Sequence, residues 1–372
     1  MTAGMRPEDT PVMTAGLRPE NTKTFDAFLA LSREIGADML KTQGAGGNTS
    51  FKQEGILWVK ASGTWLSQAG ERDIMVPVAI EPLAAALRAG DPRAEKATDF
   101  IIAGRNGSGL RPSIETSFHA VLPQTVVAHY HCVNTIALSV LEDRDAMIAE
   151  RMAKVPDLTW ATVPYRRPGT PLAREIDRVA GDRPDVLILY NHGIVVTGET
   201  VDEVRLRIAR VTEALRLPER EGAPADPAAL AARAAHSGFH PAEDCRSHKT
   251  ALDAASATVA TGGSLYPDHV IFLGTEIGVL AGDETVNAHA AARKAEGRDM
   301  PKMLLVPGEG VLLSDELTAG GRVMARCLAE VAVRIPADAR LVYLDAAQEY
   351  ELTHWEAEQY RQALDRQESQ TA

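Results

Sequence analysis

The chain of 372 residues is 45% hydrophobic and 24% charged, as in an ordinary globular protein, and its length predicts two domains or one large domain with an appendage. Its formal net charge of −12 and pI of about 5.4, without a strong cluster of lysine and arginine, argue against a nucleic-acid partner. Three widely spaced cysteines, and no apolar run or N-terminal pattern typical of a membrane span or signal peptide, predict a cytoplasmic protein.

The start of the chain contains an imperfect repeat. MTAGMRPEDT at 1–10 returns as MTAGLRPENT at 13–22 without apolar periodicity, so we expect residues 1–22 to be a flexible N-terminal segment. TFDAFLALSREIGADML follows, and its apolar positions at helical spacing predict a helix.

A glycine-rich loop comes next, in GAGGNTSFK, before the strand-like ILWVKASGTWL. The loop lacks the third glycine of GxGxxG and the GK[ST] of a P-loop, which argues against a nicotinamide or P-loop site. Gly44, Gly46 and Gly47 either form a nest of backbone N–H groups for an anion or make a tight turn.

The segment EPLAAALRAG predicts a helix, and PSIETSFHAVLP predicts another that begins at Ser113. VVAHYH at 126–131 predicts a short buried strand, on which His129 and His131 share one face because successive side chains alternate. Two histidines placed in this way are either separate hydrogen-bonded core residues or part of a metal chelate.

The elements that follow mix helices and strands. CVNTIALSVLEDRDAMIAERM predicts a helix, LTWATVPY a strand, PLAREIDRVAGD a helix, DVLILYNHGIVVTG a hairpin and ETVDEVRLRIARVTEALRL a helix. This order predicts an α/β or α+β layered domain over 23–220.

A charged, Pro- and Ala-rich stretch near residue 220 marks a boundary. Beyond it, PDHVIFLG, MLLVPGEGVLLS and ARLVYLD predict strands, and ELTAGGRVMARCLAEVAVR and ELTHWEAEQYRQALDRQ predict helices. We therefore expect residues 221–372 to form a smaller α/β extension.

A third histidine, His192, lies at the turn of the predicted hairpin. Three histidines with one open position are the arrangement of a catalytic zinc. Glu115 would supply the acid–base group beside such a metal, although a glutamate at a helix start also interacts with free backbone N–H groups. We expect His119, four residues further on, to be a hydrogen-bonding partner or a core histidine.

A second cluster occurs in HSGFHPAEDCRSH and comprises His236, His240, Cys245 and His248. Its spacings match no standard structural zinc pattern, so we expect solvated loop residues here.

In their order along the chain, GGNTS, KASGT, PSIETSFH, VVAHYH and NHG resemble the class II aldolase/adducin family over residues 24–215. That family includes fuculose- and rhamnulose-phosphate aldolases, ribulose-phosphate 4-epimerase and methylthioribulose-phosphate dehydratase. The later PDHVIFLG, VPGEGVLL and Trp-containing final helix resemble the aldolase half of bifunctional rhamnulose-phosphate aldolase/short-chain dehydrogenases. The resemblance implies a three-layer α-β-α domain with a central mixed or antiparallel sheet, plus the smaller C-terminal α/β extension.

The resemblance also implies roles for individual residues: His129, His131 and His192 as metal ligands, Glu115 as catalytic acid/base, and Asn48, Ser62, Gly63 and Ser113 at phosphate-binding positions. The metal would be zinc or another divalent ion, and the protein a homo-oligomer, a tetramer by resemblance, that acts on a small-molecule sugar or sugar phosphate in carbohydrate metabolism. Aldolases of this family also take a tyrosine from a neighbouring subunit as acid.

The implied reaction is cleavage or formation of the C3–C4 bond of a ketose or ketose phosphate through a zinc-stabilised enediolate, with Glu115 moving the proton. An epimerase, dehydratase or decarboxylase using the same site, or a non-catalytic adducin-like scaffold, are the alternatives. Ile114 stands where the sugar-phosphate enzymes usually have a second serine, which leaves open whether the substrate is phosphorylated.

Overall fold

The structure is a computed structural model that describes residues 19, 22–356, 359 and 362–366. The expected flexible segment 1–22 therefore lies almost entirely outside the described residues. We call 22–220 the N-terminal unit and the described part of 221–366 the C-terminal unit.

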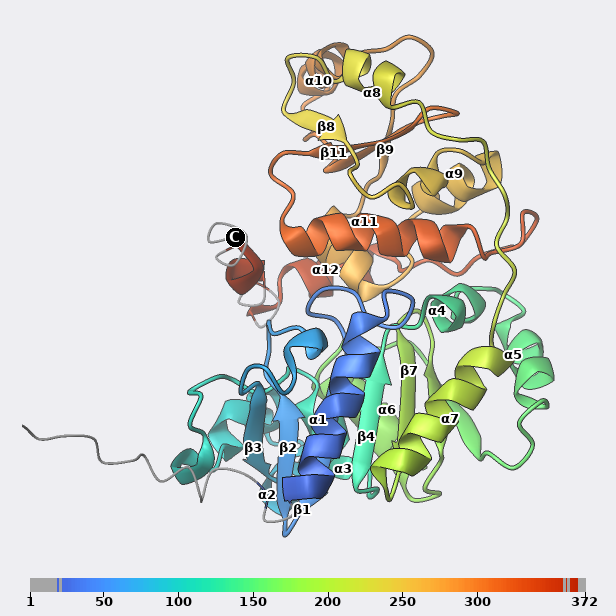
Figure 1. Cartoon of the computed structure of the whole chain (residues 1–372). Helices are drawn as coiled ribbons and strands as arrows, with labels where there is room; N and C mark the ends of the chain where they lie inside the picture. The colour runs from blue at the N-terminus through green and yellow to red at the C-terminus, as the bar shows by residue number, and fades with distance from the viewer. Residues whose placement is uncertain (1–18, 20–21, 357–358, 360–361, 367–372) are drawn as a thin grey trace, which may run out of the picture.

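The N-terminal unit is built on a seven-stranded sheet with the order β3-β2-β1-β4-β7-β6-β5 (Figure 1). Its neighbouring strands are antiparallel except for β5 and β6, which are parallel. The predicted α/β class and central mixed sheet are thus confirmed. The strands are β1 (Asn48–Gln53), β2 (Ile56–Lys60), β3 (Met75–Ala79), β4 (Val126–Tyr130), β5 (Trp160–Val163), β6 (Val186–Leu189) and β7 (Gly193–Gly198).

Helices cover both faces of this sheet. On one face lie α1 (Thr22–Ala37) and α7 (Val201–Ala214), and on the other lie α2 (Ile80–Ala89), α3 (Thr116–Val121) and α6 (Thr170–Ala180). The alternation along β4 fills both sides, because Ala128 and Tyr130 belong to the core beneath α1 and Val127 belongs to the core beneath α3. His129 consequently shares its face of the sheet with Val127.

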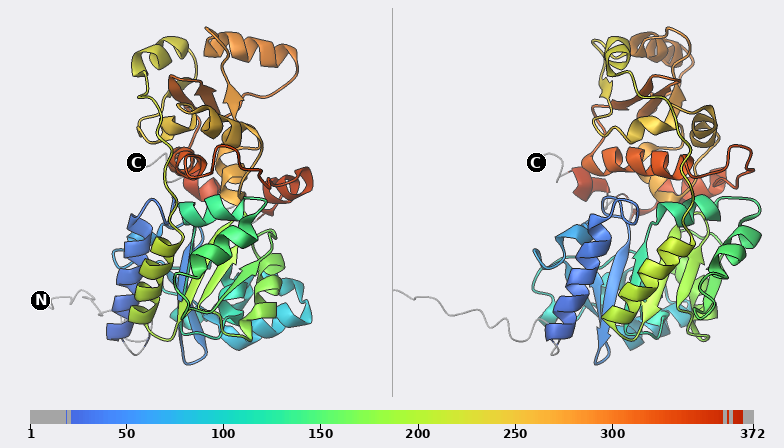
Figure 2. Two further views of the ribbon diagram at one scale, coloured as in Figure 1. Left: turned by 90° about the vertical axis from the view of Figure 1, so that its right-hand side faces the viewer. Right: turned by 45° about the vertical axis from the view of Figure 1, so that its right-hand side comes forward.

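The C-terminal unit carries a four-stranded sheet with the order β8-β11-β10-β9. Its strands are β8 (Phe239–Pro241), β9 (Gly278–Val279), β10 (Met303–Val306) and β11 (Gly310–Ser314), and its helices are α8 (Pro227–Arg233), α9 (Ala254–Thr261), α10 (Val286–Ala295), α11 (Ala319–Ala332) and α12 (Ala346–Thr353). The views in Figures 1 and 2 place α11 between the two sheets, above the loops that lead into and out of the larger one.

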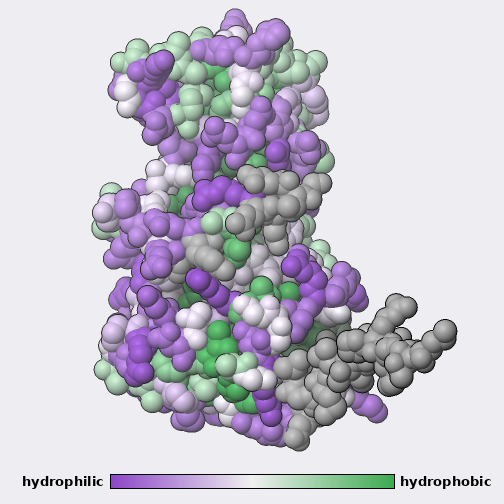
Figure 3. Space-filling view, turned by 90° about the vertical axis from the view of Figure 1, so that its left-hand side faces the viewer, coloured by the Kyte–Doolittle hydropathy of each residue, from purple (hydrophilic) through white to green (hydrophobic). Residues whose placement is uncertain are grey.

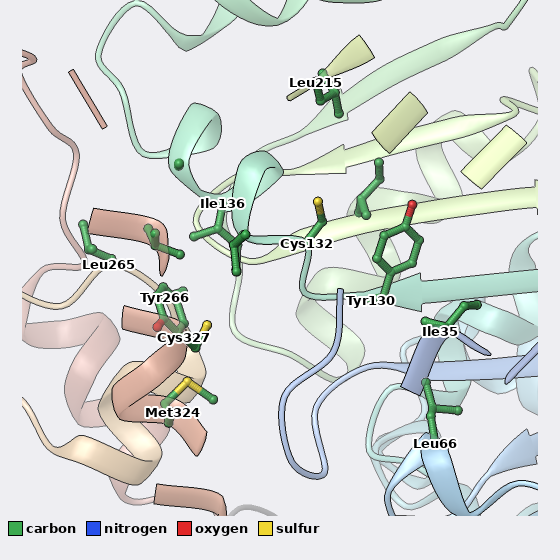
Figure 4. Close-up of a cluster of buried hydrophobic side chains, with 14 of the residues drawn as sticks. Ile35, Leu66, Tyr130, Cys132, Ile136, Leu215, Leu265, Tyr266, Met324 and Cys327 are labelled. Carbon is green, nitrogen blue, oxygen red and sulfur yellow. The ribbon is translucent and has the colours of Figure 1, made fainter. Parts of the chain in front are cut away.

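One hydrophobic core passes through both units. Ile136 of the N-terminal unit belongs to the same buried cluster as Tyr266, Met324 and Cys327 of the C-terminal unit, and Figure 4 shows these side chains close together. Residue 220 therefore separates the two sheets, while this cluster continues across it; a second cluster lies wholly in the N-terminal unit and a smaller third one wholly in the C-terminal unit.

Three sequence predictions for segments at this junction were wrong. PDHVIFLG forms a π-helix (His269–Leu273) packed on α11, and ARLVYLD contains only an isolated bridge between Leu341 and Leu141. The single helix predicted for 132–152 is two helices, α4 (Val133–Ser139) and α5 (Arg144–Met152). The helix stops between them because the chain pairs with the C-terminal unit, as the hydrogen bond from Glu142 N to Arg340 O (3.0 Å) shows.

Hydrophilic side chains cover most of the face shown in Figure 3. Among the described residues, the exposed large hydrophobic side chains are Leu206, Val279 and Tyr350. Within this part of the chain, no helix combines the length and the apolar character needed to cross a bilayer.

Candidate metal centre

Three histidines from two neighbouring strands converge in the N-terminal unit. His129 lies in β4, His131 follows the end of that strand, and His192 lies at the turn between β6 and β7. All three are buried, and one ring nitrogen of each lies within 4.8 Å of those of the other two. The Nε2 atoms of His129 and His131 are 3.2 Å apart.

The turn that carries His192 can approach β4 because it contains a glycine. A Cβ atom at Gly193 would lie 2.7 Å from the carbonyl oxygen of Tyr130, which is too close for any other residue. The preceding Asn191 has a φ of 51°, a left-handed conformation that asparagine tolerates better than most residues. The local sequence thus brings His192 against β4, which contains His129 and ends just before His131.

The ring nitrogens are in a state suited to binding a metal. Burial lowers the pKa of His129 to about 4 and that of His192 to about 3, although the nearby Glu115 carboxylate opposes both shifts. Nδ1 of His129 donates to the carbonyl of Ile194 (3.0 Å), which leaves its Nε2 as an unprotonated lone pair. Neutral imidazoles with inward-facing nitrogens fit a divalent transition metal.

Glu115 lies across from the histidines. Its Oε2 is 3.5 Å from Nε2 of His129, and its Oε1 is 3.5 Å from Nε2 of His192. Helix α3 begins at Thr116 rather than at Ser113, and Glu115 occupies the residue before it without a capping hydrogen bond from its side chain. The alternative of a helix-start glutamate bound to backbone N–H groups is therefore not what the geometry shows.

Two opposing influences act on the Glu115 carboxylate. Burial raises its pKa, but the three imidazoles and the Asn48 amide lower it, and the net pKa lies below the usual value. Asn48 Nδ2 donates to Oε2 (2.8 Å), while Oε1 is buried without a hydrogen bond. Asn48 thus holds Oε2 in place, whereas Oε1 faces the centre and accepts no hydrogen bond.

The predicted phosphate-binding residues fall into two groups. Asn48 belongs to the centre, because its side chain also donates to Ser113 Oγ (3.1 Å) and accepts from His119. Ser62 and Ser113 line a neighbouring cavity of about 450 Å³, and the Ser62 hydroxyl is buried without a hydrogen bond. Gly63, with φ of 77°, packs against Leu364 and does not line this cavity.

The same cavity contains residues that were not selected from the sequence. Arg111 and Lys96 line it together with Ile114, and Trp355 of the C-terminal unit completes the wall. Arg111 lies two residues before Ser113 in the sequence. Its positive charge beside a predicted phosphate-binding residue could have identified it as a site residue. Trp355 could not be placed there from local sequence, since it comes from 240 residues further along the chain than Glu115.

His119 behaves as expected, since it is buried and hydrogen-bonds Ser50 Oγ (2.8 Å) and Asn48. In the second cluster, His236 and Cys245 are exposed, and His240 pairs with Asp315 (2.7 Å). His248, expected to be solvated, is instead buried and accepts a hydrogen bond from Val311 N (3.0 Å), because β11 packs over it. Within the described residues, the three histidines of the N-terminal unit form the only group with metal-ligand geometry.

Comparison with known proteins places this geometry in context. The sequence model of the family described as Class II Aldolase and Adducin N-terminal domain matches residues 27–217, slightly more than half of the chain. The chain is 28% identical over 181 residues to the uncharacterized oxidoreductase YuxG of Bacillus subtilis, a match that covers 45% of this chain and 26% of that protein.

A second relative is 3-oxo-tetronate 4-phosphate decarboxylase of Escherichia coli O6:H1, 33% identical over 125 residues, with 30% of this chain and 56% of that protein covered. The corresponding decarboxylase of Pectobacterium atrosepticum is 30% identical over 143 residues, with 34% and 63% covered. The matches thus span from about a quarter to less than two thirds of these relatives' lengths.

Among solved structures, the N-terminal class II aldolase domain of a conserved protein from Thermoplasma acidophilum is similar, with 23% identity and a TM-score of 0.44 over 58% of this chain and 97% of that one. L-fuculose-1-phosphate aldolase from Thermus thermophilus has 15% identity and a TM-score of 0.35 over 52% and 92% of the two chains.

Proposed function

The chain belongs to the class II aldolase and adducin family, and from this premise we propose that it is a metal-dependent lyase whose ligands are His129, His131 and His192. The observation that carries the proposal is the convergence of three buried imidazoles opposite the Glu115 carboxylate. Burying such groups without a function would cost stability, since polar groups removed from water need compensating partners. This argues for an enzyme over a non-catalytic scaffold.

Zinc is the metal that we propose, because three protein ligands and an open position suit catalytic zinc. When bound, a divalent ion would polarise the substrate's oxygens and stabilise the negative charge that develops as a carbon–carbon bond breaks. The ligands come from a strand and an adjoining turn of one sheet, so they need little rearrangement to accept an ion.

Glu115 is the catalytic acid/base in this proposal. Cleavage of the C3–C4 bond leaves an electron pair on C3, which must receive a proton, while the C4 hydroxyl group loses its proton and becomes the aldehyde oxygen. Oε1 of Glu115 faces the centre without a hydrogen bond, while Asn48 fixes Oε2, so the carboxyl group would hold the proton at Oε1 and deliver it from there. In the direction of synthesis, the same oxygen would remove that proton.

For the substrate we propose a ketose or ketose phosphate, cleaved between C3 and C4 into a three-carbon ketone and an aldehyde. The cavity beside Glu115 is large enough for the chain of a sugar, and its lining includes the cations Arg111 and Lys96 as well as the carboxylates Glu95 and Glu356. The serines at 62 and 113 add hydroxyl groups that suit an anionic end.

A decarboxylase is the second candidate, favoured by the 33% and 30% identity to two 3-oxo-tetronate 4-phosphate decarboxylases. Loss of CO₂ from a 3-oxo acid also leaves an electron pair beside a carbonyl group. Glu115 would then protonate the same carbon as in aldol cleavage. The two reactions therefore need the same centre and differ in the group that leaves.

The test combines metal analysis with product identification. We expect purified protein to carry close to one divalent ion per chain, and a panel of ketose phosphates, free ketoses and 3-oxo acid phosphates to separate the reactions. An aldehyde with a three-carbon ketone would identify the aldolase, whereas CO₂ release would identify the decarboxylase. Protein that binds no divalent metal at micromolar concentration would contradict both. Size measurement in solution would test the homo-oligomer that we also propose.

A further inference from the structure

The C-terminal unit places a carboxylate directly behind one of the three histidines. Asp268, immediately before the π-helix His269–Leu273, has its Oδ2 atom 2.9 Å from Nδ1 of His131. The side chains of both residues are buried, with 3% of Asp268 and 6% of His131 exposed. This contact joins two segments 137 residues apart in the sequence.

The contact is made by the ring nitrogen that faces away from the centre. Nε2 of His131 points toward Nε2 of His129, and Nδ1 on the other side of the ring lies 2.9 Å from Oδ2 of Asp268. A metal-binding histidine usually donates its second N–H to a carboxylate or carbonyl group, which fixes the ring and makes its lone pair more basic. His129 has the carbonyl of Ile194 for this purpose, within its own unit, and His131 has Asp268 from the other unit.

The backbone around this pair leaves no room for a side chain. A Cβ atom at Gly46 would lie 2.8 Å from Nδ1 of His131 and 2.9 Å from Oδ2 of Asp268. The glycine loop thus closes over the pair and keeps water from it.

The segment before Asp268 is also tied to the turn that carries His192. Asn191 Nδ2 donates to the carbonyl of Leu265 (3.0 Å) and to that of Val342 (2.7 Å), both in the C-terminal unit. Tyr266, fully buried in the shared core, fixes the same segment from the other side. Asp268 is therefore held on a rigid support rather than on an exposed loop.

We infer that the C-terminal unit completes the metal centre, with Asp268 as a positioning residue that orients His131 and raises its affinity for the metal. This inference rests on the proposed function, because it requires His131 to be a ligand. It assigns a role to the C-terminal unit, of which the family match, ending at residue 217, includes no part.

The test is the affinity of the metal-free protein for Zn²⁺, measured by competition with a chromophoric chelator, together with the absorption spectrum of the Co²⁺-loaded protein. Asp268→Asn should weaken Zn²⁺ binding by roughly 10- to 100-fold, the usual effect of removing such a partner. The Co²⁺ spectrum should change as well, because the ring of His131 would no longer be held in one orientation.

A matched control is Asp315→Asn, which removes the carboxylate of another His–Asp pair of the same unit, the 2.7 Å contact with His240.

A second variant, Gly46→Ala, would separate Asp268 from His131 without changing either residue. Its control is Gly238→Ala, whose added Cβ would have no atom within 4 Å. We expect both test variants, and neither control, to lose affinity while the metal-free proteins unfold at similar denaturant concentrations.

Parental affinity in folded Asp268→Asn and Gly46→Ala proteins would overturn the inference and leave the proposed function standing. An equal loss in Asp315→Asn would also overturn it, because the effect would then come from the C-terminal unit as a whole. A parent protein without affinity for Zn²⁺ or Co²⁺ would refute the proposed function and this inference together.

Discussion

The two units of the molecule contribute to the histidine cluster in different ways. The N-terminal unit supplies the three histidines and Glu115, from strand β4 and its end, the β6–β7 turn and the residue before α3. The C-terminal unit contacts these elements from behind, through Asp268 on a ring nitrogen and through backbone carbonyls on Asn191. In the centre that we propose, the groups that bind the metal and the groups that orient them therefore lie in separate parts of the chain, joined by one core.

The largest effect should come from the N-terminal unit. His129→Ala should lose its metal and all detectable turnover, because two imidazoles rarely hold Zn²⁺ against solvent. Metal content by elemental analysis and activity on the identified substrate would check this. His240→Ala, a histidine of the C-terminal unit, should retain both. Full metal occupancy in His129→Ala would mean that the three histidines are not the ligands.

Two buried glutamates, one in each unit, make the next comparison. Glu115→Gln should keep its metal and lose roughly 10²- to 10⁴-fold in turnover, the usual contribution of a general acid or base. Glu330→Gln should instead lose stability and keep the turnover of its folded fraction, because Glu330 pairs with Arg246 and Arg334 and lies away from the centre. Steady-state kinetics and denaturant unfolding would separate the two. Parental turnover in Glu115→Gln would remove its catalytic role.

The connection between the units can be weakened at a single side chain. Asn191→Gly keeps the left-handed backbone and removes the two donors to Leu265 and Val342, which should lower the free energy of unfolding by about 1–3 kcal/mol. Glu54→Gly, at an exposed residue with φ of 53°, makes the same backbone change without that loss. Chemical denaturation would compare them, and equal stabilities would show that these hydrogen bonds do not hold the units together.

The smallest effect concerns the cavity that both units line. We expect the parent to prefer a ketose phosphate over the free ketose, and Ile114→Ser to increase this preference about tenfold, because one added hydrogen bond to a charged group contributes about 1.5–3 kcal/mol at most. The ratio of kcat/KM for the two substrates measures the preference. A parent that favours the free sugar would contradict phosphate binding, and reversal in the variant would identify Ile114 as the cause.

The N-terminal unit was predictable because its patterns are local. Alternation along VVAHYH placed His129 and His131 on one side, and the structure brings both to the same cluster. The apolar hairpin around His192 formed as two antiparallel strands, with Asn191 in the left-handed conformation at its turn and Gly193 allowing β7 to lie close to β4. The positions of the side chains in the histidine cluster thus followed from spacing and turn chemistry.

The junction was not predictable for the opposite reason. The apolar run of PDHVIFLG suits a buried strand or a buried helix equally, and packing against α11 decides for the helix. Asp268, in that same run, carries no local sign of its contact with His131. Its position depends on packing between segments that are 137 residues apart, and the periodicity of a local sequence does not reveal such a contact.

The parts of the site are synthesised in a fixed order, because Asp268 follows the three histidines in the sequence. On a ribosome that adds about 5–20 residues per second, the 137 residues between His131 and Asp268 take roughly 7–27 s to translate. His192 is made within that interval, so all three histidines are present only for its last 76 residues, while Ile136 still lacks its partner Met324. In the centre that we propose, the nascent chain therefore holds the three ligands before it holds Asp268, and tight binding of the metal should follow only after the chain beyond Asp268 has been made.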